Sequence, residues 1–231
     1  MRLKSKLKAC FLLSIFFIIN SEAAPTAVKA PFAKRKSKPT LEQPQDDLRS
    51  MQEKYKSVTA LAADFTQSQT NTALGTTRVS TGHIFIRRPN KFRWETLDPD
   101  PSILVSNGKK VWYYTPPFRK DEHGQIMVKK AADVQSQLAV DLLAGQSDFK
   151  KDFKIKRLAS ERYHLTPLKP AGDVEHIELH IEKPTNLVYK IILFTTTGNM
   201  TELALKNVTL SPQLSDAMFD FVVPENTDEI K

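Results

Sequence analysis

Five histidines and one cysteine are the side chains of this sequence that could serve as metal ligands, acid-base groups or nucleophiles. His176 and His180 occur in the segment VEHIELHIE, where alternate residues of a strand share one face. Residues four positions apart on a strand are about 13 Å from each other, so these two histidines cannot ligate one ion by themselves. Because Glu178 and Glu182 share that face, we interpret it as a solvated outer surface and not as a metal site.

The other histidines, His83, His123 and His164, are isolated in the sequence, and none stands beside a serine or cysteine in a recognised nucleophile context. The sequence contains no G-x-S-x-G motif, no H-E-x-x-H motif and no glycine-rich phosphate loop. We therefore predict no catalytic residue, no metal and no cofactor, and we expect a protein that is not an enzyme.

Cys10, the only cysteine, lies in a segment with the pattern of a secretory signal peptide. Residues 1–8 are rich in basic side chains, residues 9–19 form an apolar run, and Ala23 ends a small-residue cleavage site. The run is shorter than the roughly 20 residues that span a bilayer, which disfavours an uncleaved anchor. We predict that residues 1–23 are cleaved after Ala23 and that the mature protein is exported. A lipoprotein signal places its cysteine after the apolar run, so we expect no lipidation.

The formal net charge of +8 is concentrated near the N-terminus. Residues 24–45 combine four prolines with five lysines and arginines and lack apolar periodicity, so we predict a flexible Pro/Lys-rich tether. Residues 46–231 carry 25 basic and 24 acidic side chains, which leaves no overall positive excess to hold a phosphate backbone. We therefore expect no nucleic-acid partner.

Two apolar stripes with helical spacing stand in a sequence that otherwise alternates with period two. The first lies in 46–61 and the second ends at Gly145, a residue type that favours helix C-termini. The stripes consist of Leu48, Met51, Tyr55, Val58 and Leu61, and of Val134, Leu138 and Leu142 flanked by Ala131, Ala139 and Leu143. We predict two helices from these stripes.

Strands are predicted for most of the remaining sequence. The predicted segments are 62–69, 79–87, 91–97, 102–106, 110–115, 125–129, 153–158, 162–166, 175–182, 187–195, 200–210 and 219–223. Turn formers separate them, and Asn107-Gly108 is a strong two-residue hairpin signal. Eleven or twelve strands are too many for a flat sheet, so we predict that the antiparallel sheet curls around a contained volume. The predicted fold is one domain over residues 46–231, α+β but mostly β.

Apolar and aromatic side chains concentrate around an arginine. Four of them fall on even-numbered positions: Ile84, Ile86, Phe92 and Trp94. If the alternation survives Pro89, Arg88 points to the same side, where its guanidinium needs acceptors such as the free carbonyls of a helix C-terminus. The alternative is that Pro89 breaks the register and that both Arg87 and Arg88 lie on the surface.

These residues carry a resemblance to the periplasmic outer-membrane lipoprotein carrier protein (LolA) family. The resemblance rests on Ala63-Asp64-Phe65-Thr66-Gln67, on Gly82, on Ile86 to Trp94 with the pattern R-P-N-x-F-x-W, on Ile103 to Lys109, on Val111 to Tyr114 and on Phe219 to Pro224. It covers about residues 46–228, and the segments occur in the order that the family has.

The resemblance implies an unclosed antiparallel β-barrel of about 11 strands whose apolar concavity is covered by helices acting as a lid. It implies a chaperone that binds the acyl chains of lipoproteins released by an inner-membrane ABC transporter of the Lol system and delivers them to the outer-membrane receptor LolB. Arg88 matches the lid latch, Phe92 matches a cargo-handling position, and Ile84, Ile86 and Trp94 join the predicted lipid-binding surface.

Two departures from the family pattern concern the ends of the domain. The tether at 24–45 is long for the family, and Pro224 is followed by Glu225 where glycine is usual.

Two other functions compete with the carrier: a periplasmic binding module for a small hydrophobic ligand or free lipid, and the receptor itself. The receptor should be lipidated, which the position of Cys10 opposes. We expect a monomer.

Overall fold

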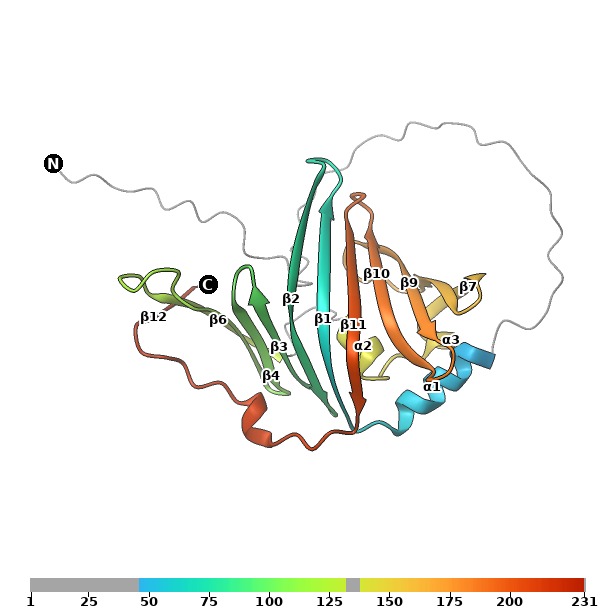
Figure 1. Ribbon diagram of the computed structural model, residues 1–231, viewed down its shortest axis with the longest axis horizontal. Helices are drawn as coiled ribbons and strands as arrows, with labels where there is room; N and C mark the ends of the chain where they lie inside the picture. The colour runs from blue at the N-terminus through green and yellow to red at the C-terminus, as the bar shows by residue number, and fades with distance from the viewer. Residues whose placement is uncertain (1–45, 132–137, 231) are drawn as a thin grey trace.

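One curved sheet of twelve strands dominates the computed structural model, which describes residues 46–131 and 138–230 (Figure 1). The strands are β1 (Ala60–Asn71), β2 (Thr76–Arg87), β3 (Lys91–Asp98), β4 (Ser102–Asn107), β5 (Lys110–Thr115), β6 (Gly124–Lys130), β7 (Phe153–Ala159), β8 (Arg162–Pro167), β9 (Val174–Glu182), β10 (Leu187–Thr195), β11 (Met200–Leu210) and β12 (Thr227–Glu229). The predicted leader and tether, residues 1–45, lie outside the described residues.

The sheet consists of two meanders joined through the first strand. Its order is β12-β6-β5-β4-β3-β2-β1-β11-β10-β9-β8-β7, and neighbours are antiparallel except for β12, which runs parallel to β6. Leu61 of β1 pairs with Ile86 of β2 on one side and with Leu210 of β11 on the other. The order runs from one edge strand to the other without closing, which confirms the predicted unclosed, mostly antiparallel barrel.

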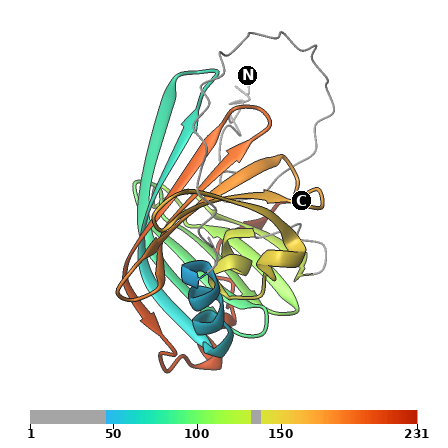
Figure 2. The same cartoon turned by 90° about the vertical axis from the view of Figure 1, so that its right-hand side faces the viewer.

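Three helices lie on the concave side of this sheet (Figure 2). They are α1 (Asp46–Ser57), α2 (Leu138–Leu143) and α3 (Phe149–Asp152). The first helix ends at Ser57 and is shorter than the predicted stripe, because Leu61 already belongs to β1. The side chain of Leu61 fits the helical stripe and the inward face of the strand equally well. The second stripe begins in 132–137, outside the described residues, and ends as predicted at Gly145, whose φ is +61°.

The main core lies between the concave face and the helices. Alternate residues of each strand are buried there, as the period of two requires. It includes Met51 and Tyr55 of α1, Leu142 and Leu143 of α2, and inward-facing side chains of β1–β5 and β7–β11. Among the described residues no helix is long and apolar enough to cross a membrane.

The C-terminal segment differs from the prediction. Residues 219–223 alternate like a strand but form none: Asp216–Phe219 is a short 3-10 helix (η2), and the chain then crosses the outer face of the sheet to β12 (Figure 1). Phe221 packs on a second apolar cluster, made of Val105, Trp112, Tyr114 and Ile126. The alternation of 219–223 therefore reflects side chains that pack on the outer face of the sheet, and not a strand that pairs with a neighbour.

Candidate functional site

Four apolar side chains of β2 and β3 form the centre of the concave face. Ile84 pairs with Trp94, and Ile86 pairs with Phe92, across one antiparallel ladder. All four are at most 4% exposed and belong to the main core cluster. The Trp94 ring lies 4.6 Å from that of Phe65 in β1, centroid to centroid. The predicted lipid-binding residues therefore share one continuous apolar surface.

Arg88 joins the turn between β2 and β3 to the ends of two helices. Its Nη2 donates to the carbonyl of Tyr55 at 2.7 Å and its Nη1 to that of Lys56 at 2.9 Å, both in the last turn of α1. Its Nε donates to the carbonyl of Ala144, immediately after α2, at 2.5 Å. Helix C-termini leave such carbonyls unpaired and carry partial negative charge, so a cation is favoured there. Burial lowers the pKa of the Arg88 guanidinium from its ordinary value.

Arg87 serves the opposite face of the sheet. It donates to the carbonyl of Leu214 at 2.7 Å, forms an ion pair with Asp216 and lies over the ring of Phe219 at 5.2 Å from its centroid. Adjacent arginines therefore hold different parts of the chain: Arg88 holds the helices on the inside, and Arg87 holds the C-terminal segment on the outside. The alternative that both arginines lie on the surface is wrong.

Tyr55 is a functional candidate that the sequence reasoning missed. Its carbonyl accepts from Arg88, while its hydroxyl accepts from the backbone N–H of Val188 in β10 at 3.1 Å. Burial raises the pKa of the Tyr55 hydroxyl to about 12. One residue of α1 therefore contacts both meanders. Its place in the apolar stripe signalled burial but gave no sign of these two hydrogen bonds.

Asp141 carries a carboxyl group in the middle of α2. Burial raises its pKa to about 6, because the charged form loses hydration. Its neighbours Leu142 and Leu143 are at most 2% exposed. No pattern in the sequence indicates this burial, since an acid beside an apolar stripe normally lies on the solvated face of a helix.

The histidine face of β9 is less solvated than expected. The His176 ring stacks between those of His164 and Phe194, with both centroids at 4.3 Å, and His180 is only 8% exposed. The interpretation as a solvated surface is therefore wrong for His180, whose ring meets that of Tyr189 in β10 edge-on, with the centroids 5.8 Å apart. Across residues 46–131 and 138–230, no three His, Cys, Asp or Glu side chains are grouped so that they could hold a metal ion.

This chain is similar in sequence to outer-membrane lipoprotein carrier proteins. The family model described as outer membrane lipoprotein carrier protein LolA matches residues 56–222. An outer-membrane lipoprotein carrier protein of Francisella philomiragia is 26% identical over 182 residues, covering 77% of this chain and 84% of its own, and one of Dechloromonas aromatica is 27% identical over 177 residues, covering 76% and 83%. The crystal structure of a LolA superfamily protein from Nitrosomonas europaea has a TM-score of 0.40 at 10% identity, covering 75% of this chain and 97% of that one.

Proposed function

The chain belongs to the outer membrane lipoprotein carrier protein LolA family, and from this premise we propose that it binds the acyl chains of lipoproteins in the periplasm and carries them from the inner membrane to the outer membrane. It receives them from an ABC transporter of the Lol system and passes them to LolB or an equivalent receptor. It acts as a monomer and without catalysis.

Such a carrier shields the acyl chains from water while they cross the periplasm. Burying a methylene contributes about 0.8 kcal/mol, so the acyl chains of one lipoprotein cost more than about 10 kcal/mol to expose during the crossing. Ile84, Ile86, Phe92 and Trp94 offer a continuous apolar surface that can replace water around such chains. These side chains are covered in the closed molecule, so binding requires that α1 and α2 move away from the sheet.

The hydrogen bonds of Arg88 to both helices are the observation that supports the proposal. Each charge-assisted hydrogen bond contributes about 1.5–3 kcal/mol, so opening the lid costs free energy that is subtracted from the affinity for cargo. A carrier without an energy source of its own passes cargo only toward higher affinity, so its own affinity must stay moderate. Arg88 acts as a latch that holds the empty carrier closed and keeps the affinity within that range.

Native mass spectrometry of the protein purified from its own periplasm tests the proposal. We expect a fraction of the molecules to carry an acylated polypeptide. A free lipid or another small hydrophobic ligand in its place would favour a binding module of similar shape and would contradict the carrier function.

A further inference from the structure

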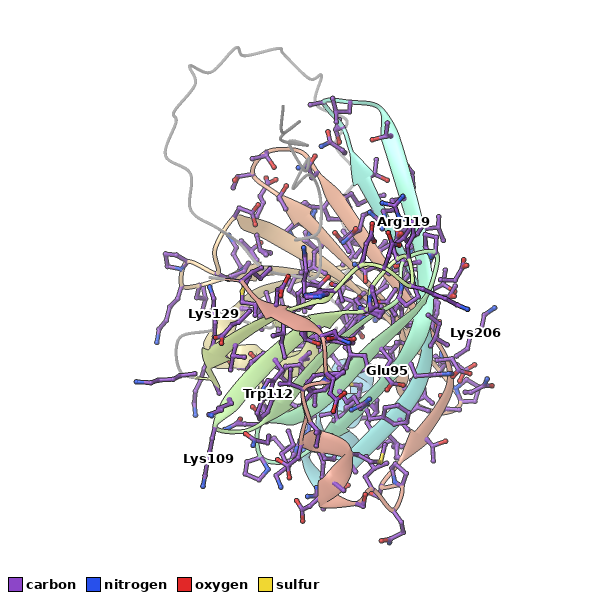
Figure 3. All side chains as sticks on the ribbon, turned by 90° about the vertical axis from the view of Figure 1, so that its left-hand side faces the viewer. Glu95, Lys109, Trp112, Arg119, Lys129 and Lys206 are labelled. Carbon is purple, nitrogen blue, oxygen red and sulfur yellow. The ribbon has the colours of Figure 1, made fainter. Side chains whose placement is uncertain are left out.

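Four exposed lysines gather at one end of β5 and β6, and we call Lys109, Lys110, Lys129 and Lys130 the lysine corner. Lys110 lies directly opposite Lys130 in the antiparallel ladder, and Lys129 lies opposite Val111. The carbonyl of Lys109 accepts from the N–H of Ala131 at 2.9 Å, which brings the β4–β5 turn against the end of β6. Figure 3 shows Lys109 and Lys129 projecting at the same side of the molecule.

The charges of the lysine corner are not neutralised within the described residues. None of the four lysines forms an ion pair there, although neighbouring cations do: Arg87 and Lys91 both pair with Asp216. Asp220 accepts from Asn107 at 3.0 Å, beside the corner, but pairs with none of its lysines. Like charges directly opposite each other destabilise a sheet. The Lys110–Lys130 pair therefore does not serve stability, which indicates a role in binding an anion.

The lysine corner lies at the same end of the sheet as the Arg88 latch. The β4–β5 turn packs on the β2–β3 turn: Ser106 Oγ donates to the carbonyl of Asn90 at 3.1 Å, and a Cβ on Gly108 would lie 3.7 Å from the carbonyl oxygen of Pro89. A partner surface that binds the lysine corner therefore also faces the end of the molecule where Arg88 holds the helices.

We propose that the lysine corner binds an anionic phospholipid surface and presents the latch end of the carrier to the membrane from which cargo is collected. This inference rests on the proposed function. Lysine ammonium groups are flexible point charges without the fixed donor geometry of arginine, so they suit many headgroups in varying positions better than one shaped site on a protein. The local arrangement supplies this attraction although the domain as a whole is nearly neutral.

Vesicle flotation with the mature protein tests the inference. The test variant changes the whole corner, Lys109→Gln, Lys110→Gln, Lys129→Gln and Lys130→Gln. The control makes the same change in net charge at the other edge of the sheet, where Lys150, Lys151, Lys154 and Lys156 are also exposed, each replaced by Gln. The vesicles contain phosphatidylcholine with phosphatidylglycerol, or phosphatidylcholine alone.

We expect the wild-type protein and the control variant to bind the anionic vesicles alike, and the corner variant to bind about tenfold or more weakly. High salt should abolish the difference, and neutral vesicles should bind none of the three proteins. An equal loss of vesicle binding in both variants would show that net charge alone, and not the position of the lysines, causes the binding. Unchanged binding of the corner variant would assign the membrane contact to another segment, such as basic residues 29–38. Either result overturns the inference.

The outcome is separable from that of the proposed function. Native mass spectrometry of the corner variant reports cargo independently of vesicle binding. A corner variant that floats normally but receives less cargo from the transporter would show that an acidic protein surface, and not lipid, is the partner, which also overturns the inference while the carrier function stands.

Discussion

Gly145 leaves no room for a side chain against Arg88. A Cβ at position 145 would lie 2.4 Å from Arg88 Nη2 and 2.9 Å from both the Cβ and the carbonyl oxygen of Tyr55. Its φ of +61° is also a conformation that glycine adopts without steric cost. The hydrogen bonds that hold both helices therefore depend on a residue that contributes no atom to them.

Gly145→Ala should weaken the latch, and Gly75→Ala provides a matched control. Gly75 has nearly the same φ, +62°, but a Cβ there meets nothing within 4 Å. Both variants carry the backbone strain of about 1–2 kcal/mol, and only Gly145→Ala also displaces Arg88. We expect faster hydrogen exchange of the α1 amides in Gly145→Ala alone, measured by mass spectrometry. Equal exchange in the two variants would show that the contact does not matter.

Arg88→Leu should leave cargo bound too tightly, because the lid no longer gains its closing hydrogen bonds. Arg87→Leu is the comparison, since it removes the neighbouring guanidinium from the outer face and leaves the helix contacts intact. We expect release of an acylated polypeptide to a receptor to slow about tenfold or more in Arg88→Leu, and to change little in Arg87→Leu. Normal release by Arg88→Leu would refute the latch.

The two tryptophans can report which face of the sheet receives acyl chains. Trp94 lies in the concave cluster, and Trp112 lies in the outer cluster with Phe221. Trp112→Phe retains Trp94 as the only tryptophan, and Trp94→Phe retains Trp112. A brominated acyl chain should quench most of the Trp94 emission and little of the Trp112 emission. The reverse pattern would move the cargo site to the outer face.

Asp141→Asn should stabilise the protein at neutral pH. Because the folded-state pKa, about 6, lies above the ordinary value of 3.8, the stability contributed by this group is fully present below 3.8 and is lost as pH rises through 6. We expect the substitution to raise the free energy of unfolding by about 1–2 kcal/mol more near pH 7.5 than near pH 4.5. Urea denaturation at both pH values measures it, and an equal gain at both would contradict the burial of the carboxylate.

Local patterns predicted most strands and turns because their signals are short-range. Alternation identified β2 and β3, and Asn107-Gly108 forms the β4–β5 turn with Gly108 at φ +87°. The predictions that are wrong depend on contacts between segments far apart in the sequence. Phe219 and Phe221 alternate like strand residues, but whether a strand forms depends on a free edge elsewhere, and β12 pairs there through the polar residues Thr227–Glu229.

The site shows the same division. The charge of Arg88 on an apolar face predicted its need for acceptors, and the structure supplies carbonyls from two helices. The sequence places Tyr55 in an apolar stripe and Gly145 at a helix end, but it does not show how either residue acts on Arg88. Their contributions there are a carbonyl oxygen and an absent side chain, and neither alters the pattern of apolar residues. The ring stack that covers His176 is assembled from three strands, so spacing within one segment could not predict it.

The position of β1 in the middle of the sheet also affects how each new molecule folds. One edge of β1 pairs with β2, which follows it directly, whereas the other pairs with β11, near the end of the sequence. During synthesis that second edge stays without its partner until β11 has emerged. Unpaired strand edges recruit strands of other chains, so the nascent protein is most prone to aggregate in this interval, and a holding chaperone is most effective there.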